Sequence, residues 1–226
     1  AQWVERDGNK AVALREDILR KYPDDKRNLF SLGFIYFHQG KLAEAENAFE
    51  TCLGLDPDFS QAANHLGGVY LELGEFEKAV EATKSYIALT PREPNGWDSL
   101  GIVYARMGKI EDGMTAFQEA LKLRPDTYSS ASGLGYLLAF KERYAEALDS
   151  VESYLSLNLS AQMRAQALWW KAFYLYWLGR FTQSHEVLRQ AQETARTVDF
   201  TNEIAIPLLS CRLFFDGGRF EAAKKA

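Results

Sequence analysis

The sequence predicts an all-α fold, a stacked array of antiparallel helix pairs. Two observations predict it: a 34-residue repeat, and the helix-ending glycines and prolines that recur within each repeat. Leu-Gly pairs recur at this interval, at Leu32-Gly33, Leu66-Gly67, Leu100-Gly101 and Leu134-Gly135. Glycines and prolines follow at fixed distances, at Gly40, Gly74, Gly108, Pro57, Pro91 and Pro125. A fixed period of roughly 20 to 50 residues indicates a stacked array in which each unit contacts only its neighbours.

The apolar spacing within residues 26–59 predicts two helices joined by a short turn. The i, i+3, i+4, i+7 spacing of one helix face occurs first at Leu29, Leu32, Gly33 and Tyr36. It recurs at Leu42, Ala45, Phe49, Cys52 and Leu53. Gly40 ends the first helix because glycine tolerates left-handed geometry, and Pro57 stops the second. Gly33 and Ala45 are small, so the two backbones can approach closely where the helices cross.

We expect one array over residues 1–226. Its regular repeats are expected at 26–59, 60–93, 94–127 and 128–161. The register then slips, so an irregular repeat is expected at 165–198, with Ser160 capping a lengthened first helix. Partial repeats are expected at 1–25, which matches only a second helix, and at 204–226, around Gly218-Arg219-Phe220.

Charge and hydropathy exclude two classes of partner. The net charge is −5, the pI is near 5.4, and no basic run exceeds Lys224-Lys225, so we expect no nucleic-acid partner. No apolar run approaches the roughly 18 to 20 residues of a membrane span. The first residues lack the pattern of a signal peptide, so a cytoplasmic location is expected rather than a secreted one. Because the sequence does not begin with Met, we expect a processed or cloned fragment.

We expect neither catalysis nor a bound cofactor or metal. The sequence has no Gly-rich phosphate loop, no HExxH motif and no local Ser-His-Asp arrangement. His38, His65 and His185 lack the spacing of metal ligands. Cys52 and Cys211 lie about four repeats apart, too far for a disulfide. Both are expected to be packed as small apolar residues.

A second stripe on the first helices changes its chemistry from repeat to repeat, while the core stripe stays apolar. Varied chemistry on a fixed scaffold is what a recognition surface needs. The candidate partner-binding residues are therefore Phe30, Phe34, Phe37, His38, Asn64, His65, Asp98, Ser99, Arg106, Tyr136, Phe140, Trp169, Trp170, Phe173 and Trp177. Polar members in the middle are expected to fix a peptide backbone or charge, and aromatic members at the ends to hold apolar side chains. The alternative, that part of the stripe only packs against the adjacent first helix, stays open.

The segment Leu168–Leu178 is unusually aromatic. It contains Trp169, Trp170, Phe173, Tyr174, Tyr176 and Trp177. These side chains project all round a helix, so the segment is more than an ordinary surface helix. Two interpretations stay open. Either the helix is sandwiched between irregular neighbouring repeats, or it forms an exposed aromatic wall that anchors an apolar partner.

The repeated residues resemble the tetratricopeptide repeat (TPR) family over nearly the whole chain. The chain departs from the family pattern at Gly113, Ala63 and Ala131. The resemblance implies a right-handed α-α superhelix, the TPR solenoid. It also implies a groove lined by first helices that holds a peptide or helix of another protein, and hence a non-enzymatic interaction scaffold.

An alternative function is self-association, or regulation within a larger multidomain protein. Both ends stop within a repeat and would expose apolar faces that whole arrays cap with polar helices. A homo-oligomer that forms through the ends is therefore a further hypothesis. Segments 22–25 and 90–95 are similar to regulatory arrays attached to bacterial kinases or transcription regulators. A third hypothesis is that the repeats carry substrates to an attached enzyme.

Overall fold

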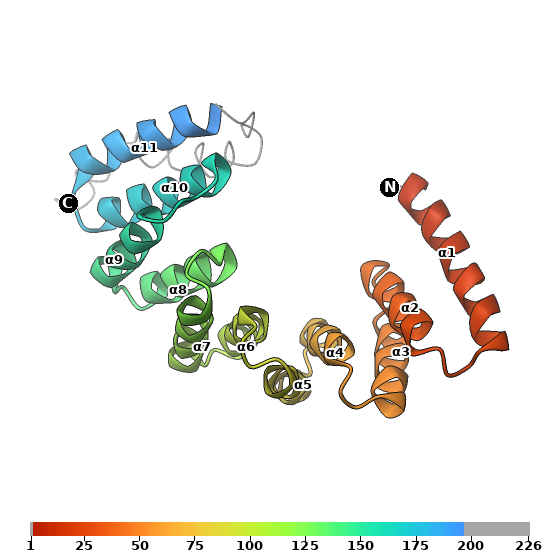
Figure 1. Ribbon diagram of the computed structural model, residues 1–226. Helices are drawn as coiled ribbons and strands as arrows, with labels where there is room; N and C mark the ends of the chain where they lie inside the picture. Colours follow the sequence, from red (N-terminus) through yellow and green to blue (C-terminus); the bar gives the residue numbers. More distant parts are fainter. Residues whose placement is uncertain (1, 197–226) are drawn as a thin grey trace, which may run out of the picture. The chain divides into compact units, whose positions relative to one another are not determined.

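The computed structural model describes residues 2–196, and every secondary-structure element within them is an α-helix (Figure 1). The helices are α1 (Gln2–Lys21), α2 (Lys26–His38), α3 (Leu42–Leu55), α4 (Ser60–Leu73), α5 (Phe76–Leu89), α6 (Pro94–Arg106), α7 (Ile110–Leu123), α8 (Tyr128–Phe140), α9 (Tyr144–Leu155), α10 (Ala161–Trp177) and α11 (Phe181–Arg196). The predicted fold class, an all-α array of helix pairs, is confirmed. The helices form two compact units that divide between Arg124 and Pro125.

The turn within each helix pair has the geometry that glycine favours. A positive φ of 72° to 76° occurs at Gly40, Gly74, Gly108 and Gly179. The next residue then closes the turn, as when the Lys41 N–H donates to the Tyr36 carbonyl at 2.9 Å. The α8–α9 turn makes the same bond from Arg143, but its left-handed residue is Glu142, with φ 58°. The backbone geometry is therefore repeated even where the glycine is not.

Small residues allow the paired helices to cross closely, as predicted. Ala45 on α3, the partner helix of α2, is fully buried. A Cβ added at Gly33 would lie 2.8 Å from Cε1 of Phe49, and one added at Gly101 would lie 2.7 Å from Cδ1 of Phe117. Such distances leave no room for a methyl group, so the aromatic rings of the second helices occupy the space that these glycines provide.

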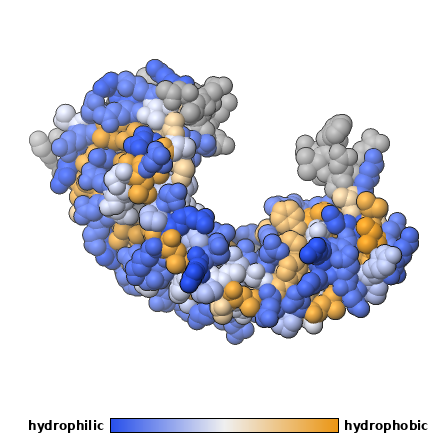
Figure 2. Space-filling model, viewed as in Figure 1, coloured by the Kyte–Doolittle hydropathy of each residue, from blue (hydrophilic) through white to orange (hydrophobic). Residues whose placement is uncertain are grey.

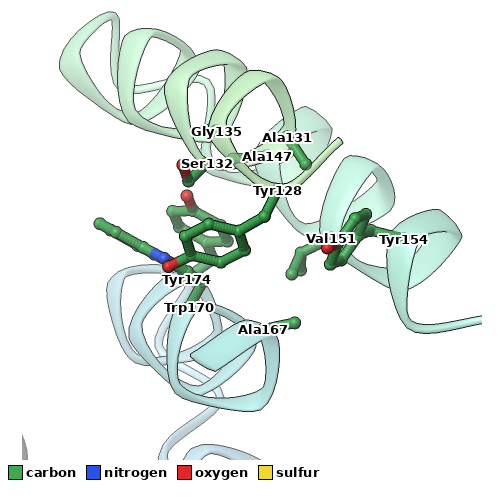
Figure 3. Close-up of a pocket in the computed structure, with 10 residues that line it drawn as sticks. All are labelled: Tyr128, Ala131, Ser132, Gly135, Ala147, Val151, Tyr154, Ala167, Trp170 and Tyr174. Atoms are coloured by element: carbon green, nitrogen blue, oxygen red, sulfur yellow. The ribbon is translucent and has the colours of Figure 1, made fainter. Parts of the chain in front are cut away.

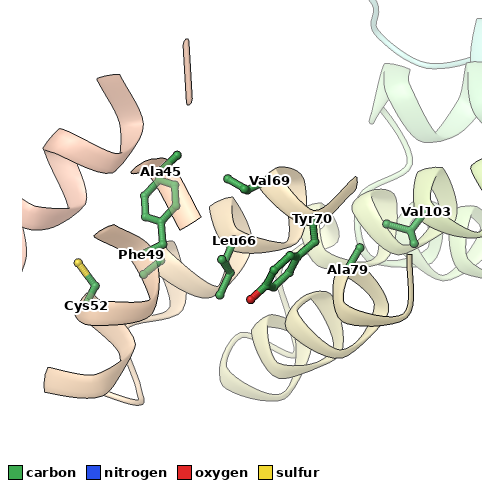
Figure 4. Packing of buried hydrophobic residues seen from close by; sticks show 9 residues of the cluster. Ala45, Phe49, Cys52, Leu66, Val69, Tyr70, Ala79 and Val103 are labelled. Atoms are coloured by element: carbon green, nitrogen blue, oxygen red, sulfur yellow. The ribbon is translucent and has the colours of Figure 1, made fainter. Parts of the chain in front are cut away.

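The core of unit 1 extends from helix to helix (Figure 4). Its buried members are Ala45, Phe49, Cys52, Ala62, Leu66, Val69, Tyr70, Ala79 and Val103. Helix α1 packs on α2 in the same way as α3 packs on α4, as equivalent hydrogen bonds 34 residues apart show. The Tyr36 hydroxyl donates to Glu16 and the Tyr70 hydroxyl donates to Glu50, both at 2.8 Å.

Unit 2 contains the slip in register. Ser160 caps α10 as predicted, because its hydroxyl oxygen accepts a hydrogen bond from the Met163 N–H at 3.2 Å. Helix α10 begins at Ala161, so the first helix of the irregular repeat is indeed longer than the others. The partial repeat expected at 204–226, including Cys211, lies outside the described residues. The repeat boundaries themselves stay predictions.

Candidate partner-binding surface

The first helices of unit 1 form a continuous face. Helix α2 contacts α4, and α4 contacts α6. Equivalent positions on successive helices are 34 residues apart, so Phe34, Gly68 and Ile102 occupy the same place on the three helices. The face contains nine of the predicted site residues, which lie on α2 (Phe30, Phe34, Phe37, His38), α4 (Asn64, His65) and α6 (Asp98, Ser99, Arg106).

The phenylalanine cluster on α2 divides into packed and accessible members. The Phe30 ring is half-buried, with its centroid 5.3 Å from that of Phe59 and 5.7 Å from that of Phe49. Phe34 is 41% exposed, and its ring centroid lies 4.3 Å from that of His38 and 5.4 Å from that of His65. The packing interpretation therefore describes Phe30, whereas Phe34 presents apolar surface to solvent.

His65 joins this cluster to the core of the repeat. Its ring stacks on the buried Phe49 ring with centroids 5.6 Å apart and planes inclined at 15°. Burial, and secondarily the nearby His38, lowers the pKa of His65 below its ordinary value. The imidazole is therefore neutral at pH 7, and the aromatic end of the face carries no charge from it.

The polar residues lie on adjacent helices, as a shared site requires. Asn64 is half-buried on α4, and Asp98 and Ser99 are half-buried on α6. Arg106 is exposed in the last turn of α6, where the helix dipole favours a cation. Unit 1 thus places an aromatic end on α2 next to a polar region on α4 and α6.

In unit 2 two aromatic residues in the second half of α8 are exposed. Tyr136 is 58% exposed and Phe140 is 64% exposed. Trp177 at the end of α10 is 44% exposed and stacks on Tyr144, with ring centroids 5.7 Å apart and planes at 11°. These exposures are large for aromatic side chains, so the surface differs from an ordinary packed face.

The aromatic block of α10 combines both interpretations that the sequence left open. Tyr174 is only 1% exposed and Leu175 is buried as well, so one side of the helix packs in the core. Trp169, Trp170 and Phe173 are half-buried and contact one another, with centroids 4.7 to 6.2 Å apart. Figure 2 shows hydrophobic residues gathered over the α10 region of this unit.

The first helices of unit 2 offer no free charge. Helix α8 has no charged residue. Helix α10 has two, and both bind α9 or the loop after it. Arg164 donates to the carbonyls of Leu155 and Leu157 at 3.2 and 3.1 Å, and Lys171 pairs with Glu152 at 2.8 Å. The first helices of unit 2 therefore present aromatic side chains without a free charge, unlike the partly charged first helices of unit 1.

A cavity between α8, α9 and α10 is too small for a ligand (Figure 3). Its volume is about 10 Å³, close to the space that one water molecule needs. Tyr128, Tyr154, Trp170 and Tyr174 line it beside small residues such as Gly135. Burial, together with Tyr128, raises the pKa of Tyr174 above its ordinary value, so its hydroxyl stays protonated. We interpret the cavity as a packing gap.

The described residues hold no group of three or more His, Cys, Asp or Glu side chains arranged for a metal ion. Among them, too, no helix is both long enough and apolar enough to cross a bilayer.

Cys52 is buried, and its thiol lies 3.3 Å from the Lys26 carbonyl. Burial raises the pKa of this thiol to about 11, as expected for a packed residue.

One position of the face was missed from the sequence. Gly68 lies between Phe34 and Ile102 in the repeat register, directly after Gly67 of the Leu-Gly signature. The signal available was the 34-residue spacing itself. It places a glycine where the adjacent repeats have large apolar residues.

Comparison with known proteins identifies the repeats. One tetratricopeptide repeat model matches residues 36–101, and a second matches residues 1–58 and 99–161. No curated protein matches the sequence.

Solved structures share the fold at low identity. MamA from Desulfovibrio magneticus RS-1, from residue 41 to its end, is 22% identical with a TM-score of 0.62; the match covers 69% of this chain and 89% of that one. YrrB, described as a TPR protein with an unusual peptide-binding site, is 15% identical with a TM-score of 0.61, covering 88% and 97% of the two chains. A thermophilic TPR protein of Thermus thermophilus is 23% identical with a TM-score of 0.57, covering 81% and 99%.

Proposed function

The chain belongs to the tetratricopeptide repeat family, and from this membership we propose that it is a non-enzymatic scaffold that binds a peptide or helix of another protein. Binding takes place along the first helices, in the groove expected there. One observation carries the proposal. The first helices expose large apolar side chains next to a closed core, with Phe34 41%, Tyr136 58% and Phe140 64% exposed.

The chemistry of the two units supports contacts with a protein. Aromatic side chains supply much of the energy of protein interfaces, and charged or amide groups fix the orientation of a bound segment. Unit 1 combines Phe34 with Asp98 and Arg106, whereas helix α8 of unit 2 supplies exposed aromatic side chains and has no charged residue. YrrB has a peptide-binding site on the same fold, which makes a peptide a reasonable first partner to test.

The test uses a peptide selected on the full chain from a random peptide library. The triple variant Phe34→Ala, Asp98→Ala, Arg106→Ala should weaken its binding at least tenfold, because each truncated anchor typically costs about 1 kcal/mol or more. The matched control is Leu55→Ala, which removes an apolar side chain that is 42% exposed, as Phe34 is 41% exposed, but lies on the second helix α3. Circular dichroism should show equal helicity in all variants.

Unchanged peptide affinity in the triple variant, with the helicity preserved, would refute the assignment of this face. The absence of catalysis stays a prediction, because it rests on the missing motifs and on the family. Turnover of a substrate by the purified full chain would contradict it.

Self-association is the second candidate function. Leu14 on α1 is 63% exposed and Tyr22 just after it is 66% exposed, so α1 presents apolar surface away from α2. Light scattering at increasing protein concentration tests this candidate, with Leu14→Lys as the variant that should dissociate an oligomer. A strict monomer at every concentration excludes it.

A further inference from the structure

We propose that the space above Gly68 is a specificity pocket of unit 1 for one large apolar side chain of an extended partner segment. A basic residue of the same segment, two positions from that apolar residue, then faces Glu72. The term Gly68 pocket is used below for the space bordered by Phe34, Phe37, Gly68 and Ile102. The inference rests on the proposed function, since it names the kind of peptide that this face binds.

The pocket follows from the register of three parallel helices. Phe34 and Ile102 are the equivalent residues on the helices to either side of Gly68, and they are 41% and 36% exposed. A Cβ built at Gly68 would meet nothing closer than Cζ of Phe37, at 3.8 Å. The face therefore has an open position in the middle, flanked by apolar side chains on both sides.

Packing does not explain why this residue is glycine. Added Cβ atoms would come within 2.8 Å of a neighbouring atom at Gly33, Gly67, Gly96, Gly101 and Gly135. Gly68 has no such contact, although it lies inside α4 and costs the helix about 1 kcal/mol relative to alanine. Gly54 inside α3 is equally uncrowded, so the argument depends on position: only Gly68 lies on the first-helix face, in register with the exposed side chains of Phe34 and Ile102.

The charge of Glu72 on α4 determines which side chain we expect the partner to place next to its apolar residue. His65 lies one turn before Gly68 and Glu72 lies one turn after it, on the same face of the helix. Glu72 is exposed and forms no ion pair within the part of the chain that the structure describes. Residues four apart on a helix lie about 5 to 6 Å from each other, and alternate residues of an extended chain about 7 Å. A Lys or Arg two positions from the apolar residue therefore reaches the Glu72 carboxylate.

The experiment uses the full chain and an acetylated, amidated pentapeptide, Lys-Gly-Phe-Gly-Lys, whose symmetry serves either direction of binding. Shifts of the Gly67 and Leu71 amide resonances report occupation of the pocket. We expect saturable binding with a Kd on the order of 1 mM, typical of a few contacts by a small ligand. A peptide with Ala in place of Phe should bind at least tenfold more weakly. A peptide with Glu in place of both Lys should bind about threefold more weakly.

Gly68→Leu fills the pocket and should abolish the shifts, whereas Gly54→Leu is the matched control. Gly54 is likewise a glycine inside a helix without a crowding neighbour, since an added Cβ would meet nothing within 4 Å, but it lies on the second helix α3. Glu72→Gln should weaken binding about two- to fivefold and remove its salt dependence. Gly68→Ala, which fits without a clash, provides a second variant and should reduce affinity while raising stability.

Three results would overturn the inference: no saturable shifts with the Phe peptide, equal binding of the Ala peptide, or full binding by a folded Gly68→Leu variant. The proposed function fails separately, when the library-selected peptide binds the Phe34, Asp98 and Arg106 triple variant normally. A selected peptide that needs those three residues but tolerates Gly68→Leu overturns only the Gly68 pocket.

Discussion

Replacing the adjacent glycines Gly67 and Gly68 by alanine, one at a time, should change the stability of unit 1 in opposite directions. Both lie inside α4, so alanine improves the helix propensity equally, by about 1 kcal/mol. A Cβ at Gly68 meets only Phe37 at 3.8 Å, so Gly68→Ala keeps that gain. A Cβ at Gly67 would lie 2.8 Å from Oγ1 of Thr83 and 3.7 Å from the Ala79 carbonyl oxygen.

The cost at Gly67 is large because its neighbour cannot move away. Thr83 is only 2% exposed and its β-branched side chain is stiff. Inserting a methylene into such a site costs about 1 to 3 kcal/mol. The propensity gain cancels between the two variants, so their free energies of unfolding should differ by that same amount, about 1 to 3 kcal/mol, with Gly68→Ala the more stable.

Urea denaturation followed by circular dichroism measures this difference. With an m value of about 2 kcal/mol per molar, a difference of about 2 kcal/mol separates the two midpoints by about 1 M urea. Equal midpoints, or a higher midpoint for Gly67→Ala, would refute the reasoning. The Gly68 pocket would then lose its structural basis, because the two glycines would be equally crowded or equally free.

Three further predictions concern other parts of the chain. Glu142→Gly should raise the free energy of unfolding of unit 2 by up to about 1 kcal/mol, since it relieves a left-handed non-glycine residue; Glu142→Ala should show no gain in urea denaturation. Burial lowers the pKa of His65, so the unfolded state binds its proton more tightly and stability should fall as pH drops below about 6.5. Melting curves on both sides of that pH test this, and an equal pH dependence in His65→Phe would contradict it. Burial raises the pKa of Cys52 to about 11, so iodoacetamide at pH 8 should label Cys52 far more slowly in the folded Cys211→Ser variant than in the same variant unfolded in urea. Equal rates in the two states would show that the thiol is accessible in the folded protein.

Much of the candidate site was predictable because the repeat assigns each residue a place. The spacing of Leu32 and Leu66 placed the second stripe on the first helices, and Phe34 and Tyr136 are indeed exposed there. The sequence could not separate Phe30 from Phe34, since both belong to that stripe. Only contacts with Phe59 and Phe49 show that the Phe30 ring is largely taken up by packing.

The sequence by itself determined the fold class, the helix pairs and the turns, because those depend on local periodicity and on backbone conformations that glycine and proline set. Tertiary structure alone decided which members of a stripe are free. The Trp-rich helix α10 buries Tyr174 and exposes Trp177, and of two adjacent glycines one is crowded by Thr83 while the other borders open space. These differences arise from neighbouring helices that are distant in sequence, and periodicity within a single helix carries no information about them.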